Sequence, residues 1–196
     1  MRGAFLWSSF AFKRKKMNLL KIVLLLPLLA AMGNSHYPWS AKLSLKVDNC
    51  LEATFATSDY SLKKMSLSSS LEEKTKLRMT NNLYQIQGGS AVLGYIYVDQ
   101  APSMKNVFDY AVVFSPDLKI TNTKVLIYRE QHGRQIGTKR WLQQFFDMNK
   151  NSRPQLGQEV DGITGATISA SSMTKAVHDL LSDVDYLESQ GFFSNE

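Results

Sequence analysis

Residues 83–98, LYQIQGGSAVLGYIYV, decide the fold. Two runs of β-prone residues, 83–87 and 92–98, stand on either side of Gly88-Gly89-Ser90. Glycine tolerates the positive φ angles that tight hairpin turns require, and two β-prone runs separated by such a turn pair with each other. The stretch therefore predicts a β-hairpin.

Two further strands are expected shortly after the hairpin. Residues 108–115 are rich in Val, Tyr and Phe, Pro116-Asp117 supplies a turn, and residues 119–129 are the next β-prone run. Parallel strands need a crossover of a dozen or more residues, which these connections do not provide. The sequence therefore predicts an antiparallel sheet of about four strands.

The residues after the sheet carry helical periodicity. A loop at residues 130–138 leads into residues 139–147, where aromatic and aliphatic residues recur at helical spacing. Residues 160–167 then enter a final helix with one apolar stripe, which consists of Met173, Val177, Leu180, Leu181, Val184 and Leu187. A sheet with a C-terminal helix packed on it defines an α+β domain, which we place at residues 83–190.

Residues 36–82 form a poorly patterned N-terminal extension of this domain. They show a weak helical stretch at residues 41–55 and a solvated one at residues 71–79. The lone cysteine, Cys50, rules out an internal disulfide and a multi-cysteine metal site. Cys50 fits either a small buried residue or a reactive thiol.

The net charge of +6 belongs to the N-terminal end of the chain. The first 33 residues hold six cations and no acid, whereas the rest has 17 Lys and Arg against 17 Asp and Glu. Nucleic-acid binding needs a basic face to contact phosphates, and a neutral body does not supply one. The composition therefore speaks against a nucleic-acid partner.

A hydrophobic leader opens the chain. Basic residues 13–16 precede an apolar run of 11 residues, 22–32, which is followed by the small residue Gly33. This is the order of a secretory signal, and the run is shorter than the ~17–25 residues that span a bilayer as a helix. Residues 1–35 are therefore a signal peptide or a membrane anchor, for which Met17 is a more ordinary start than Met1. Both alternatives predict a periplasmic or other extracytoplasmic location, with membrane association through the leader.

The stretch with the most chemistry is DGITGATIS, residues 161–169. It is a turn of small residues that feeds a helix and presents hydroxyl groups at the helix start. Unpaired N–H groups and the helix dipole make such a start a ready anion site, and Asp161 stands six residues before Thr167. The plain alternative is that Thr164, Thr167 or Ser169 only caps the helix.

This string resembles the flavinylation motif Asp-x-x-(Ser/Thr)-Gly-Ala-Thr of the FMN-binding domain family, found in the C subunit of sodium-translocating NADH:quinone reductase and the G subunit of Rnf complexes. The matching positions are Asp161, Thr164, Gly165, Ala166 and Thr167. The resemblance implies FMN bound covalently at Thr167 through a phosphoester, made from FAD by a separate magnesium-dependent flavin transferase. It also implies that Asp161 assists the transferase and that Gly165 and Ala166 keep the acceptor accessible.

The resemblance extends upstream of the motif. Gly94-Tyr95 is similar to the family's Gly-Tyr strand, and residues 128–137 take the place of its glycine-rich, flavin-facing loop. It implies a flavin ring held against Tyr95 or Trp141, with the cation of Arg134 near its edge. From residue type alone, the alternative interpretation is that Trp141 is a core residue and Arg134 is a solvated surface residue.

The sequence offers no set of catalytic residues. It has no recognisable Ser-His-Asp or paired-carboxylate arrangement, and His36, His132 and His178 are too scattered for a metal site. We therefore expect an electron-transfer flavoprotein rather than an enzyme with its own substrate, with a redox protein or a membrane electron-transfer complex as partner. The alternatives are a secreted non-redox binding or scaffold module without flavin, and a threonine hydrolase, although a Gly-x-Ser-x-Gly elbow is absent.

Overall fold

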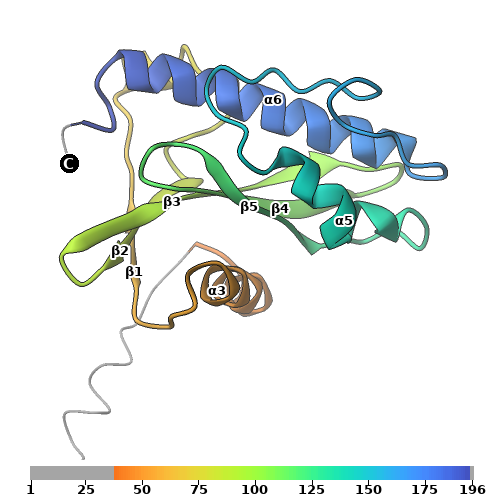
Figure 1. Cartoon of the computed structure of the whole chain (residues 1–196), viewed down its shortest axis with the longest axis horizontal. Coiled ribbons are helices and arrows are strands. Elements are labelled where there is room, and N and C mark those ends of the chain that lie inside the picture. Colours follow the sequence, from red (N-terminus) through yellow and green to blue (C-terminus); the bar gives the residue numbers. More distant parts are fainter. Residues whose placement is uncertain (1–37, 195–196) are drawn as a thin grey trace, which may run out of the picture. The chain divides into compact units, whose positions relative to one another are not determined.

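The computed structural model describes residues 38–194 of the chain (Figure 1). The expected signal peptide or membrane anchor, residues 1–35, lies outside the described residues. Within residues 38–194, no helix combines the length and the apolar character needed to cross a membrane.

One antiparallel sheet of five strands forms within the described residues. The strands lie in sequence order: β1 (Ser61–Lys64), β2 (Leu83–Gly88), β3 (Ala91–Pro102), β4 (Val107–Phe114) and β5 (Ile120–Ile127). The α+β class, the antiparallel pairing and the hairpin of β2 and β3 are confirmed. β1 is an additional strand that the sequence did not predict.

Helices cover both faces of this sheet (Figure 1). α3 (Ala41–Phe55) lies on one face and α6 (Thr167–Ser189) on the other. The shorter helical segments are α4 (Ser69–Glu72), η1 (Arg134–Gly137), α5 (Lys139–Leu142) and η2 (Gln143–Phe145). Because both faces are covered, Phe108 to Phe114 in β4 are all buried, and apart from Asp109 these residues are apolar or aromatic instead of alternating with polar ones.

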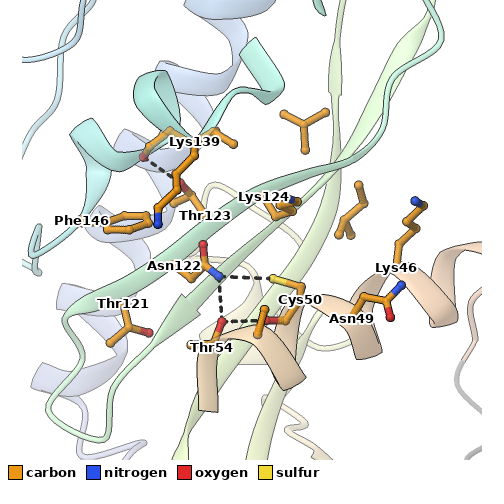
Figure 2. Close-up of a pocket in the computed structure, with 14 residues that line it drawn as sticks. Lys46, Asn49, Cys50, Thr54, Thr121, Asn122, Thr123, Lys124, Lys139 and Phe146 are labelled. Carbon is orange, nitrogen blue, oxygen red and sulfur yellow. Dashed lines mark hydrogen bonds between the residues drawn. The ribbon is translucent and has the colours of Figure 1, made fainter. Parts of the chain in front are cut away.

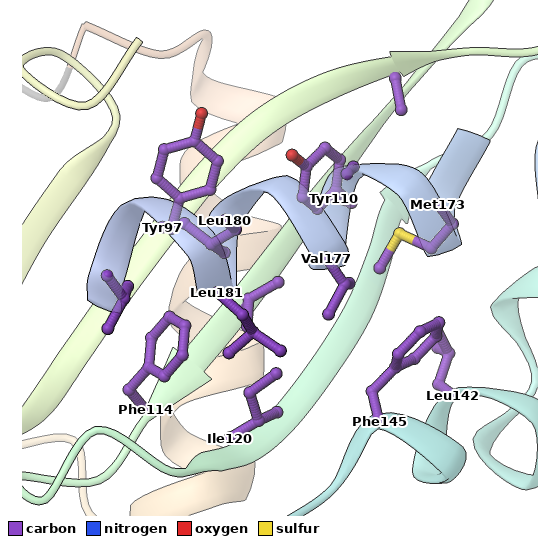
Figure 3. Close-up of a cluster of buried hydrophobic side chains, with 14 of the residues drawn as sticks. Tyr97, Tyr110, Phe114, Ile120, Leu142, Phe145, Met173, Val177, Leu180 and Leu181 are labelled. Atoms are coloured by element: carbon purple, nitrogen blue, oxygen red, sulfur yellow. The ribbon is translucent and has the colours of Figure 1, made fainter. Parts of the chain in front are cut away.

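α6 packs through the stripe that its periodicity predicts. Met173, Val177, Leu180 and Leu181 face the aromatic residues of β3 and β4 (Figure 3). Leu180 is fully buried, and burial of such a side chain stabilises the fold by about 1.5–3 kcal/mol. The C-terminal helix packed on the sheet is therefore confirmed.

α3 shows that the N-terminal extension contributes to the core of the described fold. Its bounds match the weak helical stretch of the sequence, and Val47, Cys50 and Leu51 are buried against the sheet. Burial raises the pKa of the Cys50 thiol to about 11. Cys50 is therefore a small buried residue, because a thiol with that pKa stays protonated at neutral pH.

The helix expected at residues 71–79 is wrong. Only Ser69–Glu72 is helical, and the N–H groups up to Thr75 still bond to backbone carbonyls. Beyond Thr75, N–H groups bond to carboxylates instead. Asp183 of α6 accepts the N–H groups of Lys76 and Leu77 at 2.8 and 2.9 Å, and Glu72 accepts that of Thr80 at 3.1 Å. These longer-range bonds override the local helical preference.

The helix expected at residues 139–147 is shorter than the stretch over which apolar residues recur at helical spacing. α5 ends at Leu142, and η2 continues the chain as a 3₁₀ turn to Phe145. The Thr123 hydroxyl of β5 donates to the Leu142 carbonyl at 2.9 Å, and the amide of Ile120 donates to the Met148 carbonyl at 2.8 Å. The segment therefore covers the free edge of β5, which would otherwise expose unpaired backbone groups.

Candidate functional site

A tight turn delivers the chain to the start of α6. The amide of Ala166 donates to the carbonyl of Ile163 at 3.0 Å, which closes a four-residue turn. Gly165 stands at the third position of this turn with φ +78°, a conformation that favours glycine there. Thr167 follows as the first residue of α6 and is exposed.

No side chain caps α6. Its N-cap residue is Ala166, which has no capping hydroxyl, and the first turn carries no acidic residue. The Ser169 hydroxyl bonds to the Tyr128 hydroxyl at 3.1 Å, while the Thr167 hydroxyl makes no hydrogen bond within residues 38–194. The capping interpretation therefore does not account for these hydroxyl groups, and the positive end of the helix stays open to an anion.

A cavity of about 650 Å³ opens beside Thr167. Its volume lies in the range of small-molecule sites. Three segments form its wall: 104–106, 128–132 and 165–169. Its charged lining residues are Lys105, Arg129 and Glu130. The apolar lining residues Met104 and Ile168 are 74% and 52% exposed. The site therefore combines charged groups of both signs with exposed apolar surface.

The loop after β5 packs closely on the start of α6. A Cβ atom at Gly133 would lie 2.8 Å from both the Ala166 Cβ and the Tyr128 hydroxyl, so a side chain does not fit there. Ser169, which bonds to Tyr128, is buried. The wall formed by residues 128–132 is therefore held in a fixed position against the turn that carries Thr167.

Glu130 ties this loop to the turn between β3 and β4. Its carboxylate accepts hydrogen bonds from the Ser103 hydroxyl at 2.7 Å and from the amides of Lys105 and Asn106 at 2.7 and 2.9 Å. Hydrogen bonds from the Lys105 amide, then from Ser103 and Asn106, hold the pKa of Glu130 below its ordinary value. Next to it, Arg129 pairs with the buried carboxylate of Asp109 at 2.6 Å.

We expect acid to release the turn at residues 103–106. A lowered carboxyl pKa contributes stability above the ordinary value of 4.5, and this contribution is lost as the pH falls through the folded-state pKa. NMR amide shifts of Lys105 and Asn106 should therefore change together with an apparent pKa below 4.5. In Glu130→Gln this titration should be absent; a midpoint at or above the ordinary carboxyl value would contradict the tether.

Asp161 and Trp141 meet behind the turn. The Trp141 indole N–H donates to the backbone carbonyl of Asp161 at 2.8 Å, and the Asp161 amide donates to Gln144 at 2.9 Å. Trp141 is buried in the core and does not line the cavity. Asp161 is exposed, and its carboxylate makes no hydrogen bond or salt bridge among residues 38–194, so it is accessible to another protein.

Two further residues expected at the site, Tyr95 and Arg134, do not line the cavity either. Tyr95 packs against Phe193, with ring centroids 5.1 Å apart, beyond the C-terminal end of α6. Because α6 has 23 residues, its two ends are about 33 Å apart, and the structure does not bring Tyr95 to Thr167. Arg134 is exposed in η1 and does not line the cavity, although Gly133 before it touches Ala166.

The structure adds residues that the sequence did not single out. Met104, Lys105 and Asn106 reach the site because the β3–β4 turn lies beside the start of α6. Ile168 stands next to the motif, and its 52% exposure is unusual for a large apolar residue. Only the pairing of distant segments brings these residues together, so no local pattern could have identified the turn.

An uncapped helix start, an exposed hydroxyl on its first residue and a cavity beside it form a site with the features of an anion-binding pocket for a small molecule. Residues 105–182 match the family model of the FMN-binding domain, which confirms the resemblance of the sequence to this family. The match covers about two fifths of the chain, from the turn before β4 into the second half of α6. It includes residues 161–167 but not Gly94-Tyr95.

Among solved structures, the chain is similar to NqrC of Shewanella oneidensis. The two share 17% sequence identity with a TM-score of 0.46, and the alignment covers 72% of this chain and 70% of NqrC. A comparison with curated proteins finds no match.

Proposed function

We propose that the protein is an extracytoplasmic flavoprotein that carries FMN covalently at Thr167 and passes electrons between redox partners. One observation carries this proposal: the free hydroxyl of Thr167 is exposed at the lip of a cavity in an FMN-binding domain. Bound flavin supplies one- and two-electron redox chemistry, whereas the protein sets its position and exposure.

The residues of the cavity fit the chemical groups of FMN. The open end of α6 and the ammonium group of Lys105 suit a phosphate. The exposed side chains of Met104 and Ile168 offer apolar surface for an aromatic ring. A helix N-terminus stabilises a negative charge by on the order of 0.3–1 kcal/mol, or ~2 when partly buried. This is too little to retain a diffusible cofactor, so a covalent bond has a physical reason.

The attachment is a phosphoryl transfer by a partner enzyme. The Thr167 hydroxyl oxygen forms a bond to the FMN phosphorus of FAD, the phosphoanhydride bond breaks, and AMP leaves while the hydroxyl proton is released. A magnesium-dependent flavin transferase would carry out this step. Asp161, Thr164, Gly165 and Ala166 are the residues it would meet around the acceptor, and all but Ala166 are exposed or partly exposed.

The expected leader and the proposed flavin together suggest where the protein works and with which kind of partner. Residues 1–35 would take the domain out of the cytoplasm as a signal peptide or a membrane anchor. A redox protein or a membrane electron-transfer complex would then deliver and accept the electrons.

Peptide mass analysis tests the proposal. The full chain is exported together with a flavin transferase and then digested with trypsin, which should release residues 151–175 because the Arg153-Pro154 bond resists cleavage. This peptide should be heavier by FMN less one water, with fragment ions that place the added mass on Thr167. An unmodified peptide would overturn the proposal and leave a non-redox binding module.

A further inference from the structure

A second cavity, of about 580 Å³, lies between α3, β5 and α5 (Figure 2). It shares no lining residue with the cavity beside Thr167. Because α3 and α6 cover opposite faces of the sheet, a molecule in the second cavity would not touch the start of α6. It is therefore a separate candidate site.

The charge of this cavity has one sign. Lys46 of α3, Lys124 of β5 and Lys139 of α5 line it, and no Asp or Glu does (Figure 2). None of the three lysines has a salt bridge within the part of the chain that the structure describes. Three elements that are distant in sequence therefore bring three uncompensated cations to one cavity.

Hydrogen bonds connect the polar side chains of the cavity wall between the lysines. Asn122 donates to the Thr54 hydroxyl at 2.7 Å, and that hydroxyl donates to the Cys50 carbonyl at 2.7 Å (Figure 2). The Thr123 hydroxyl donates to the carbonyl of Leu142. These bonds join α3, β5 and α5 around the cavity, so the polar wall keeps its shape while the ammonium groups stay available to a ligand.

The cavity also has an apolar component. Its lining includes the side chains of Cys50, Ala53, Val125, Leu126, Leu142 and Phe146. Cys50, Leu126 and Leu142 are buried core residues. A small inorganic anion would leave this surface in water, whereas a ligand with an apolar body would cover it.

We infer that this cavity binds a soluble amphipathic organic anion, with an apolar body between α3 and β5 and a carboxylate, phosphate or sulfonate group near Lys46, Lys124 and Lys139. The inference does not rest on flavin attachment, because the two cavities are separate. It is therefore tested in full-length Thr167→Ala, where the covalent site is removed.

Three probes with the same alkyl chain separate charge from apolar burial. Decanoate and decylammonium are titrated below their micelle-forming concentrations and decanol below its solubility limit, with amide shifts of Asn49, Cys50 and Asn122 as the readout. We expect decanoate to bind most tightly and decylammonium least, and added salt to weaken decanoate binding. Equal binding of decanoate and decanol, or shifts confined to residues outside this cavity, would overturn the inference.

Lysine substitutions test the basic groups. Lys46→Gln and Lys124→Gln should each weaken decanoate binding by about two- to fivefold, as expected for a partly exposed ion pair. Lys42→Gln is the matched control, because Lys42 lies on α3 one turn before Lys46 and does not line the cavity. It should leave the affinity unchanged. An equal loss in all three variants would show only general charge attraction and overturn the site.

A binding experiment with lipid vesicles distinguishes a soluble ligand from a membrane surface. Binding to phosphatidylglycerol vesicles that depends on Lys46 and Lys124, without binding of monomeric decanoate, would overturn the assignment to a soluble ligand. Decanoate binding that depends on both lysines supports it, whatever the vesicles show.

Discussion

Thr167→Ala should abolish flavin fluorescence in the denatured protein, because the substitution removes the only proposed acceptor oxygen. The fold should survive, since Thr167 is exposed and its hydroxyl makes no hydrogen bond within residues 38–194. Surface substitutions of this kind change the free energy of unfolding by about 0.5 kcal/mol or less, so Tm should stay within about 2 °C. Flavin fluorescence in denaturing gels measures the loss of covalent flavin, and thermal unfolding of the parent protein and Thr167→Ala measures the change in Tm.

Ser171→Ala is the matched control for the acceptor. Ser171 is exposed on α6 one turn after Thr167, and its substitution also removes a single hydroxyl group. It should retain full flavin loading when exported with the transferase. Flavin that survives denaturation in Thr167→Ala would place the attachment elsewhere, and a loss in both variants would point to a damaged helix start rather than to one acceptor atom.

Gly94→Ala should produce the largest loss of stability. Gly94 has φ +154°, and a Cβ atom there would lie 2.0 Å from the backbone oxygen of Phe114. Neither backbone can move freely, because Tyr95 pairs with Phe114 in the middle of the sheet. Steric overlap and backbone strain together should lower the free energy of unfolding by about 3 kcal/mol or more, and Tm by roughly 6–12 °C.

Gly137→Ala provides the comparison for Gly94→Ala. The nearest atom to an added Cβ at Gly137 is the Val125 Cβ at 3.9 Å, an ordinary contact, and its φ is not positive. Its Tm should therefore remain close to that of the parent protein. Equal stability of the two variants in chemical or thermal unfolding would mean that β3 and β4 are not held as closely at Gly94 as described. The close approach to Phe114 thus gives the glycine of the Gly-Tyr pair a packing role in the sheet.

Periodicity and turn chemistry predicted the elements whose own residues determine them. The β2–β3 hairpin follows from the glycine turn, and α6 follows from a stripe of apolar residues every three or four positions. β1 could not be found this way, because its four residues, SLKK, are mostly exposed and become a strand only by pairing with β2. The same holds for residues 71–79, where Glu72 and Asp183 take the amides that a helix would use.

The candidate site divides in a similar way. The motif at residues 161–167 could be read from the sequence because one turn and one helix start contain it. Met104 and Glu130 could not, because they reach Thr167 only through the register of β3, β4 and β5. The position of Tyr95 could not be predicted either. Its resemblance to a strand of the family does not say which end of α6 the side chain faces, and it packs against Phe193 beyond the C-terminal end.

The exposure of Thr167 also bears on how quickly such a carrier would work. A prosthetic group fixed at the rim, rather than in the interior, needs no opening motion before another protein can approach it. Turnover would then be governed by diffusional encounter and by the orientation of the colliding surfaces.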